Sequence, residues 1–136
     1  MQMNPYLLFS GNCEAAFKFY EQCLGGKITA LSTYGSTPAA AHVPVKIHSQ
    51  VIHARLELGD LVLMGSDSPP NQFQPPQGFY INLGMADPAE AERVFHALVE
   101  NGKVVMPFAQ TFFAHRFGTL TDQFGVPWMV VCEKAP

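Results

Sequence analysis

Two short segments place side chains that can do chemistry at alternate positions. The first carries His53, Arg55 and Glu57, and the second carries Phe113, His115 and Phe117. Alternate residues of a β-strand lie on the same face of its sheet, so each set is expected to share one face. Because an imidazole changes charge near neutral pH and a carboxylate can accept a proton, His53, Glu57 and His115 are the candidate acid–base residues.

Simpler interpretations of the same side chains remain open. Each histidine can be a hydrogen-bonded sheet residue, and Arg55 and Glu57, two apart on one strand, can form an ion pair. In a closed cleft Arg55 could instead hold an anionic group of a substrate. His53, Glu57 and His115 could also serve as metal ligands. Tyr80 fits equally well as a hydrogen-bonding residue of a cleft and as a core aromatic.

The elements that position these residues follow from hydrophobic spacing and from turn residues. A helix is expected from Cys13 to Leu24, after an Asn12 N-cap and before Gly25-Gly26. A second helix is expected between a capping box at Asp87–Glu90 and Asn101-Gly102. Strands are expected at 5–9, 27–34, 49–58, 61–66, 79–85, 104–108, 112–121 and 126–133, with a loop at 35–44 and a linker at 67–78.

This order is strand, helix, three strands, and it occurs twice. Gly25-Gly26-Lys27-Ile28 corresponds to Asn101-Gly102-Lys103-Val104, and Leu63 follows Gly59 at the same distance as Met129 follows Gly125. The sequence therefore predicts an α+β single domain, 1–136, made of two βαβββ modules at 1–67 and 78–136. Each module would be a four-stranded sheet with a helix outside, and two sheets joined by their edges would form a curled mixed sheet with a concave cleft.

Composition narrows the classes of partner. The 136 residues include only 8 Lys and Arg, scattered along a chain of net charge −3, which disfavours binding to nucleic acid. No apolar run is long enough to span a membrane, and the N-terminus lacks signal-peptide features, so a cytoplasmic protein is expected. The three cysteines have no metal-type spacing.

Several segments resemble one protein family. They are Tyr6-Leu7-Leu8-Phe9, Phe19-Tyr20, His53-Ala54-Arg55-Leu56, Leu63-Met64, Ser66-Asp67, Thr111 to Gly118 and Thr121 to Met129. With the repeat, they resemble the PhnB-like branch of the vicinal-oxygen-chelate superfamily of glyoxalases, bleomycin-resistance proteins and extradiol dioxygenases. Phe113 departs from this resemblance, because the family usually has Trp there. The resemblance also implies a homodimer.

The resemblance implies where a metal would be bound in metal-using relatives. Transferred by position, the ligands would be Pro5, Leu63, Tyr80 (or Ile81) and Met129. Pro and Leu offer no donor, and a thioether is a soft ligand suited to copper(I), so the usual divalent-metal site is not expected. Some members of the family are labelled ubiquinone-pathway methyltransferases, but this chain lacks a Gly-rich nucleotide-binding βα turn.

Three functions remain open from the sequence. The first is a cytoplasmic, metal-independent small-molecule-binding protein, with His53, Arg55, Glu57, Tyr80, Phe113, His115 and Phe117 lining the cleft and no cofactor. The second is a glyoxalase-type lyase or isomerase that uses metal or acid–base groups at displaced positions. The third is a module that binds a protein segment. Whether the protein is an enzyme is left undecided by the sequence.

Overall fold

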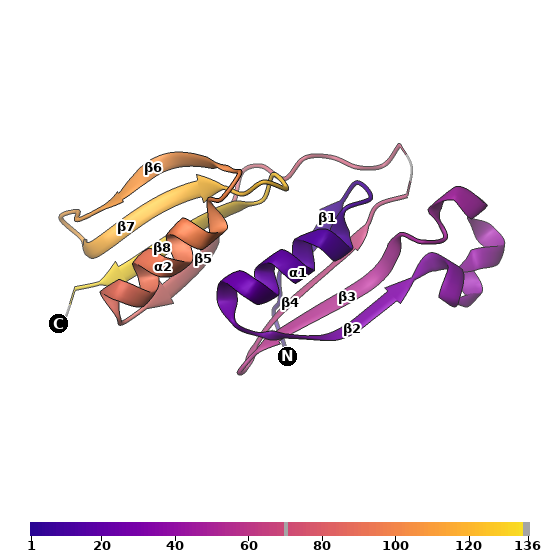
Figure 1. Cartoon of the computed structure of the whole chain (residues 1–136), viewed down its shortest axis with the longest axis horizontal. Coiled ribbons are helices and arrows are strands. Elements are labelled where there is room, and N and C mark those ends of the chain that lie inside the picture. Colours follow the sequence, from indigo (N-terminus) through magenta and orange to yellow (C-terminus); the bar gives the residue numbers. More distant parts are fainter. Residues whose placement is uncertain (70, 135–136) are drawn as a thin grey trace. The chain divides into compact units, whose positions relative to one another are not determined.

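The chain forms two compact units, Met1–Gln74 and Pro75–Pro136, and the described residues of each form one sheet and one α-helix. The computed structural model describes residues 1–69 and 71–134. In both units the order is strand, helix, three strands, as the sequence predicts (Figure 1). The α+β class and the βαβββ repeat are therefore confirmed, as two separate four-stranded mixed sheets.

The N-terminal unit is built on the sheet order β1-β4-β3-β2. Its elements are β1 (Tyr6–Phe9), α1 (Cys13–Leu24), β2 (Lys27–Thr33), β3 (Val51–Leu58) and β4 (Leu61–Asp67). β1 pairs with β4 in parallel, and the other neighbours are antiparallel. The segment expected to be a loop after β2 contains three short 3₁₀ helices, η1 (Tyr34–Ser36), η2 (Pro38–His42) and η3 (Val45–Ile47).

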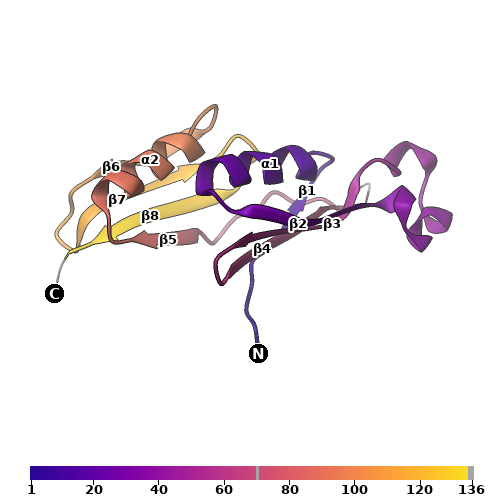
Figure 2. The same cartoon turned by 60° about the horizontal axis from the view of Figure 1, so that its bottom comes forward.

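The C-terminal unit repeats this topology with the sheet order β5-β8-β7-β6. Its elements are β5 (Ile81–Met85), α2 (Pro88–Leu98), β6 (Lys103–Ala109), β7 (Ala114–Thr121) and β8 (Pro127–Glu133). β5 pairs with β8 in parallel, whereas β6–β7 and β7–β8 are antiparallel. In Figure 2 each helix lies against one face of its own sheet, which leaves the other face of that sheet without a helix.

The helix α1 packs on its sheet through one apolar stripe. Its buried residues recur every three or four positions and are Cys13, Ala16, Phe17, Tyr20 and Cys23. They meet buried side chains of β3 such as Ala54 and Leu56. Gly65 of β4 permits close packing, because an added Cβ would come within 2.8 Å of the Phe17 ring. Gly25 ends α1 in the left-handed conformation at φ 82°, as expected of its C-cap.

The two helices are capped differently from what the sequence suggests. Asn12 precedes α1, but its side chain makes no capping hydrogen bond to the described residues. Instead Oδ1 of the buried Asp67 accepts from the N–H groups of Gly11 at 2.9 Å and Cys13 at 3.0 Å. At α2 the Asp87 side chain accepts from the Ala89 N–H, while Glu90 pairs with Arg93. The predicted capping box is therefore not formed, because Asp87 accepts from Ala89 rather than from Glu90, and the Glu90 carboxylate pairs with Arg93.

The described helices are also too short or too polar to cross a membrane.

Candidate functional site

The N-terminal sheet has one face that no helix of its unit covers. Strand alternation turns Leu7, Ala54, Leu56 and Leu63, all at most 8 % exposed, toward α1. The opposite side of the same strands carries Tyr6, Leu8, His53, Arg55, Glu57, Val62 and Met64, which we call the N-terminal open face. The predicted sharing of one face by His53, Arg55 and Glu57 agrees with this pairing.

Tyr6 and His53 contact each other across the N-terminal open face. The Tyr6 hydroxyl lies 3.3 Å from His53 Nδ1, and the two rings stack with centroids 5.9 Å apart. His53 is therefore a hydrogen-bonded residue of the sheet, although Tyr6 itself is 47 % exposed. A phenol and an imidazole in contact at a half-open surface can both hydrogen-bond a ligand and move a proton.

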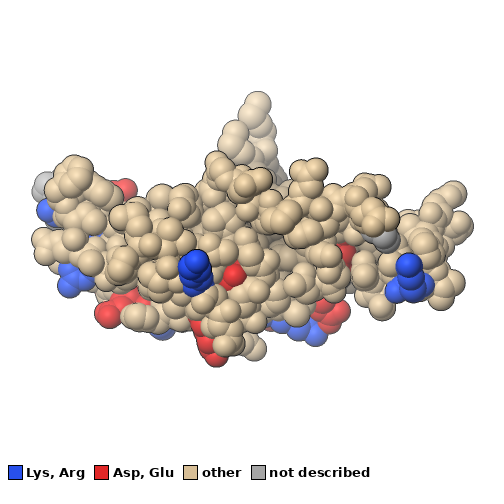
Figure 3. All heavy atoms as spheres, turned by 90° about the horizontal axis from the view of Figure 1, so that it is seen from above, with Lys and Arg blue, Asp and Glu red and all other residues tan. Residues whose placement is uncertain are grey.

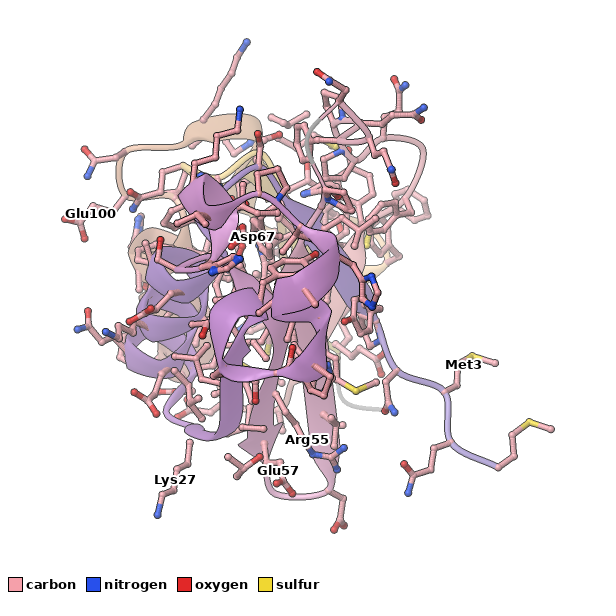
Figure 4. All side chains as sticks on the ribbon, turned by 90° about the vertical axis from the view of Figure 1, so that its right-hand side faces the viewer. Met3, Lys27, Arg55, Glu57, Asp67 and Glu100 are labelled. Carbon is pink, nitrogen blue, oxygen red and sulfur yellow. The ribbon has the colours of Figure 1, made fainter. Side chains whose placement is uncertain are left out.

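Arg55 and Glu57 form the ion pair that their spacing suggests. Arg55 Nε lies 3.5 Å from Glu57 Oε2, and the two side chains are 34 % and 39 % exposed. Figure 4 shows the two side chains next to each other, with Asp67 inside the ribbon. A hydrogen bond from the Thr29 side chain, followed by the charge of Arg55, lowers the pKa of Glu57. Glu57 is therefore a stable carboxylate at neutral pH rather than a base tuned to that range.

The C-terminal sheet has an equivalent face, formed by Asn82, Phe117, Thr119, Met129 and Val131, which we call the C-terminal open face. Strand pairing joins Met129 to both Asn82 and Thr119, and joins Phe117 to Val131. The opposite side carries Gly118, where an added Cβ would come 2.8 Å from Phe95 of α2. The Thr119 side chain is 2 % exposed, and its hydroxyl has no hydrogen-bond partner among residues 1–69 and 71–134.

Phe113 and Phe117 form the aromatic pair expected from the sequence. Their ring centroids are 5.0 Å apart at an angle of 71°, in an edge-to-face arrangement. Phe113 is 51 % exposed and precedes β7, so it extends the C-terminal open face beyond the strand.

His115 does not follow the alternation that was expected to place it with Phe117. β7 begins at Ala114, and a register shift between Ala114 and Arg116 interrupts the ladder at His115. The alternation of side chains between the two faces of the strand is therefore broken at His115. His115 lines a separate hollow of about 800 Å³ with Pro88 at the start of α2 and with Cys132.

Within the C-terminal unit, Tyr80 lines a different hollow from His115. It precedes β5, is 43 % exposed, and lines a hollow of about 380 Å³ together with Phe79 and Pro127. The structure thus brings together Tyr6 with His53, Arg55 with Glu57, and Phe113 with Phe117. It leaves His115 and Tyr80 in hollows of their own.

The positions equivalent to superfamily metal ligands need a correction in the first module. Leu63 pairs with Leu56 and faces α1, whereas Met64 pairs with both Tyr6 and Arg55 on the N-terminal open face. Met64 is thus the counterpart of Met129. Residues at the same distance from Gly59 and Gly125 are not equivalent, because the two turns differ in length. Two residues separate the paired Leu58 and Leu61, whereas five separate the paired Thr121 and Pro127.

Ile81, the other residue considered for the second module, pairs with the buried Trp128 and so faces α2. The donors at the centre of the two open faces are therefore Tyr6 with Met64 and Asn82 with Met129. Within the described part of the chain no three His, Cys, Asp or Glu side chains gather closely enough to hold a metal ion.

Sequence reasoning missed three residues that shape these faces, Tyr6, Met64 and Asn82, and it missed the burial of the Thr119 hydroxyl. The position of Tyr6 on the open face could have been predicted, because Leu7 and Phe9 are two residues apart on β1 and turn to the opposite face. Met64 was hidden by the unequal turns, and the unpaired hydroxyl of Thr119 has no signature in sequence. Cys13 adds no further candidate at α1, since burial, followed by the charges of Asp67 and Glu14, raises the pKa of its thiol.

Comparison with known proteins places the chain in a family. Residues 1–131 match the family model described as 3-demethylubiquinone-9 3-methyltransferase. Protein YjdN of Escherichia coli is 34 % identical over 142 residues, which cover 98 % of this chain and 97 % of YjdN.

Solved structures agree with this family. Protein PA1353 of Pseudomonas aeruginosa has 44 % identity and a TM-score of 0.91, with 99 % of both chains covered. A PhnB protein from Bacillus cereus has 26 % identity and a TM-score of 0.78, covering 97 % of this chain and 99 % of that one. More distant structures with TM-scores of 0.64 and 0.61, a fosfomycin resistance protein and a glyoxalase candidate, share the fold.

The family description mentions a methyltransferase, but the fold does not contain a doubly wound nucleotide-binding unit. The strand after α1 lies at the far edge of the sheet from β1, and only Ser10-Gly11-Asn12 joins β1 to α1. From the family match, the βαβββ repeat and the two four-stranded sheets, the chain belongs to the 3-demethylubiquinone-9 3-methyltransferase-like, or PhnB-like, family.

Proposed function

We propose that this protein binds a small molecule at the N-terminal open face and does so without the divalent metal of the metal-using superfamily members. The observation that carries the proposal is the contact between Tyr6 and His53 at a surface that stays half open. Tyr6 and Leu8 are each 47 % exposed, side by side with polar groups on the same face.

The composition of this face supports ligand binding. Exposed apolar side chains gathered next to a few directional polar groups are typical of ligand sites rather than of an ordinary wet surface. Arg55 adds a cation, whose Nε lies 3.5 Å from Glu57 Oε2. The guanidinium has five N–H donors, so the same side chain can also bind a carboxylate or phosphate group. An aromatic or aliphatic molecule with one anionic group matches this set.

Donor chemistry supports the absence of the usual metal. Tyr6 with Met64, and Asn82 with Met129, provide two thioethers, a phenol and an amide. Divalent ions of the Mg, Mn, Zn or Fe(II) type prefer carboxylates and imidazoles, so these residues do not fit such an ion. On the face seen in Figure 3, Lys and Arg side chains do not gather into one patch.

Binding can be tested with a thermal-shift screen of small aromatic and aliphatic acids, followed by calorimetric titration of the best compound in the presence of EDTA. We expect Tyr6→Ala, His53→Ala and Arg55→Ala each to weaken binding about tenfold or more, since each removes a contact worth about 1.4 kcal/mol or more. His96→Ala and Arg93→Ala are the matched controls, because both residues sit in exposed pairs with glutamates on α2. Binding that survives all three open-face substitutions, or that disappears with EDTA, contradicts the proposal.

A second candidate function is acid–base catalysis by a lyase or isomerase of the glyoxalase type. The 3.3 Å contact between the Tyr6 hydroxyl and His53 favours it, because a phenol can orient an imidazole that transfers a proton. Turnover of a hemithioacetal substrate that falls about a hundredfold in His53→Ala and stays intact in His96→Ala would support catalysis. Equal turnover in these two variants would reject it.

A further inference from the structure

A hollow smaller than those of His115 and Tyr80 lies at one end of the N-terminal sheet, and none of its lining residues belongs to the N-terminal open face. It has a volume of about 290 Å³, and its lining includes Ser10, Lys46, Gln50, Ser68 and Asn71. β1 and β4 run parallel and their last residues, Phe9 and Asp67, are register partners (Figure 1). Ser10 and Ser68 therefore leave the sheet next to each other, where η3 and the segment before β3 close the hollow.

Ser68 is the unusual residue of this hollow. Its side chain is 7 % exposed, and its hydroxyl has no hydrogen-bond partner within residues 1–69 and 71–134. The backbone holds it in place, because the Ser68 N–H donates to the Phe9 carbonyl at 2.8 Å. A buried hydroxyl without a partner is unfavourable, and a ligand atom that pairs with it removes that cost.

The charged and polar side chains of the hollow favour an anionic ligand. Lys46 is the charged residue among those that line it, and the other polar side chains are hydroxyls and amides, which can all donate hydrogen bonds. The neighbouring carboxylate of Asp67 is already engaged, because its two oxygens accept from the N–H groups of Gly11, Cys13 and Val51. An acceptor-only anionic group therefore meets donors on several sides.

The size and the apolar wall of the hollow limit the rest of the molecule. Ile47, which is 3 % exposed, and Phe73 line it together with the polar groups. A volume of about 290 Å³ lies at the lower end of the range for small-molecule sites, so only a few carbon atoms fit beside the charged group.

We propose that this hollow is a binding site for a small aliphatic carboxylate, with the carboxylate at Ser68 and Lys46 and the short chain on Ile47 and Phe73. The site is independent of the proposed function, because it shares no residue with the N-terminal open face.

The test is an NMR titration of the full-length ¹⁵N-labelled protein with sodium butyrate. Butyramide, which has the same shape without the charge, and inorganic phosphate serve as comparison ligands. We expect saturable shifts of the backbone signals of Gln50, Ser68 and Asn71 with butyrate, and at least about fivefold weaker binding of both comparison ligands. Equal binding of butyramide, tighter binding of phosphate, or butyrate shifts that do not saturate or that occur elsewhere would overturn the proposal.

Variants separate ligand binding from a structural role of the hydroxyl. Ser68→Ala should weaken butyrate binding about five- to tenfold, as expected for one hydrogen bond, while the melting temperature without ligand stays the same or rises. Lys46→Gln, on an exposed side chain, should weaken binding to a similar extent, and Lys27→Gln on β2 is the matched control that should not. Unchanged affinity in Ser68→Ala or in Lys46→Gln, or equal loss in Lys27→Gln, would contradict the assignment.

Discussion

Two buried aspartates organise the backbone at the ends of the sheets. Asp67 accepts hydrogen bonds from Gly11, Cys13 and Val51, which lie on three different segments of the N-terminal unit. Asp122 does the same in the C-terminal unit, where it accepts from the N–H groups of Phe124 and Val126 and from Trp128 Nε1. Both residues belong to segments that resemble the family, and here their role is to hold the ends of strands rather than to do chemistry.

The first prediction concerns Asp67. Asp67→Asn keeps the shape of the side chain but turns an NH₂ group toward at least one backbone N–H, so a buried donor loses its acceptor. We expect a loss of about 2–4 kcal/mol in the free energy of unfolding, measured by urea denaturation. Asp60→Asn, in the exposed turn between β3 and β4, is the control and should change it by less than about 0.5 kcal/mol. Similar stabilities of the two variants would contradict the role assigned to Asp67.

The second prediction concerns the titration of Glu57. Its folded-state pKa is lowered, first by the Thr29 hydrogen bond and then by Arg55, so the ionised form favours folding. This contribution is present above the pKa of the unfolded chain and is lost as the pH falls through the lowered pKa. A carboxyl NMR titration should show a rise in the pKa of Glu57 in Thr29→Val and also in Arg55→Ala, which removes both the charge and the side-chain hydrogen bond of Arg55. An unchanged pKa of Glu57 in either variant would contradict the cause assigned to that residue.

At the level of elements, bulges and turns decide which side chains share a face. The register shift between Ala114 and Arg116 separates His115 from Phe117. The turn between β3 and β4 is shorter than the turn between β7 and β8, which makes Met64, and not Leu63, the counterpart of Met129. Since side chains alternate with a period of two, one extra residue is enough to move a candidate to the opposite face.

The third prediction compares the starts of the two helices. The Asp87 side chain caps α2 by accepting from the Ala89 N–H, whereas the N–H of Cys13 at the start of α1 is bound by Asp67. Asp87→Ala should therefore lower the free energy of unfolding by about 1 kcal/mol, and Asn12→Ala by less than about 0.5 kcal/mol. Urea denaturation of both variants measures this difference. A larger loss in Asn12→Ala would show that the local residue, not Asp67, stabilises α1.

On the scale of the whole molecule, the chain uses one topology twice, and each copy has a helix on one face of its sheet. The open face of the N-terminal copy carries an ion pair and a phenol–imidazole contact, and that of the C-terminal copy carries an aromatic pair and the buried hydroxyl of Thr119. The two copies are thus alike in backbone and different in chemistry, and the strand-paired residues Tyr6–Met64 and Asn82–Met129 include no carboxylate or imidazole.

The fourth prediction follows from those donors. Protein purified without added metal should contain far less than one equivalent of Ni, Zn, Mn or Fe by elemental analysis, and EDTA should leave its melting temperature unchanged. An ion present at a hundred times its dissociation constant would contribute about 2.7 kcal/mol to stability, so its removal would lower the melting temperature by several degrees. Such a drop, reversed by adding one of these metals back, would contradict the metal-free proposal.

Much of the architecture was accessible from the sequence. Helical spacing predicts Cys13–Leu24 as a helix, and Gly25 predicts its end, because these signals are local. Alternation likewise predicts that His53, Arg55 and Glu57 share a face, since the ladder between β3 and β4 is regular from Ala54 to Leu58. The bounds of several strands differ by one or two residues, as with β3, which begins at Val51 rather than at position 49.

The sequence by itself determined the repeat and the family resemblance, because both are patterns of residue types along the chain. It also placed Arg55 with Glu57 and Phe113 with Phe117, because the two residues of each pair are close together along the chain. Only the tertiary structure decided that Asp67 caps α1, that Tyr6 contacts His53, that His115 leaves the face of Phe117, and that the hydroxyls of Ser68 and Thr119 are buried without partners. These features depend on pairing between distant segments and on bulges and turns, whose effect on neighbouring strands cannot be counted along the chain.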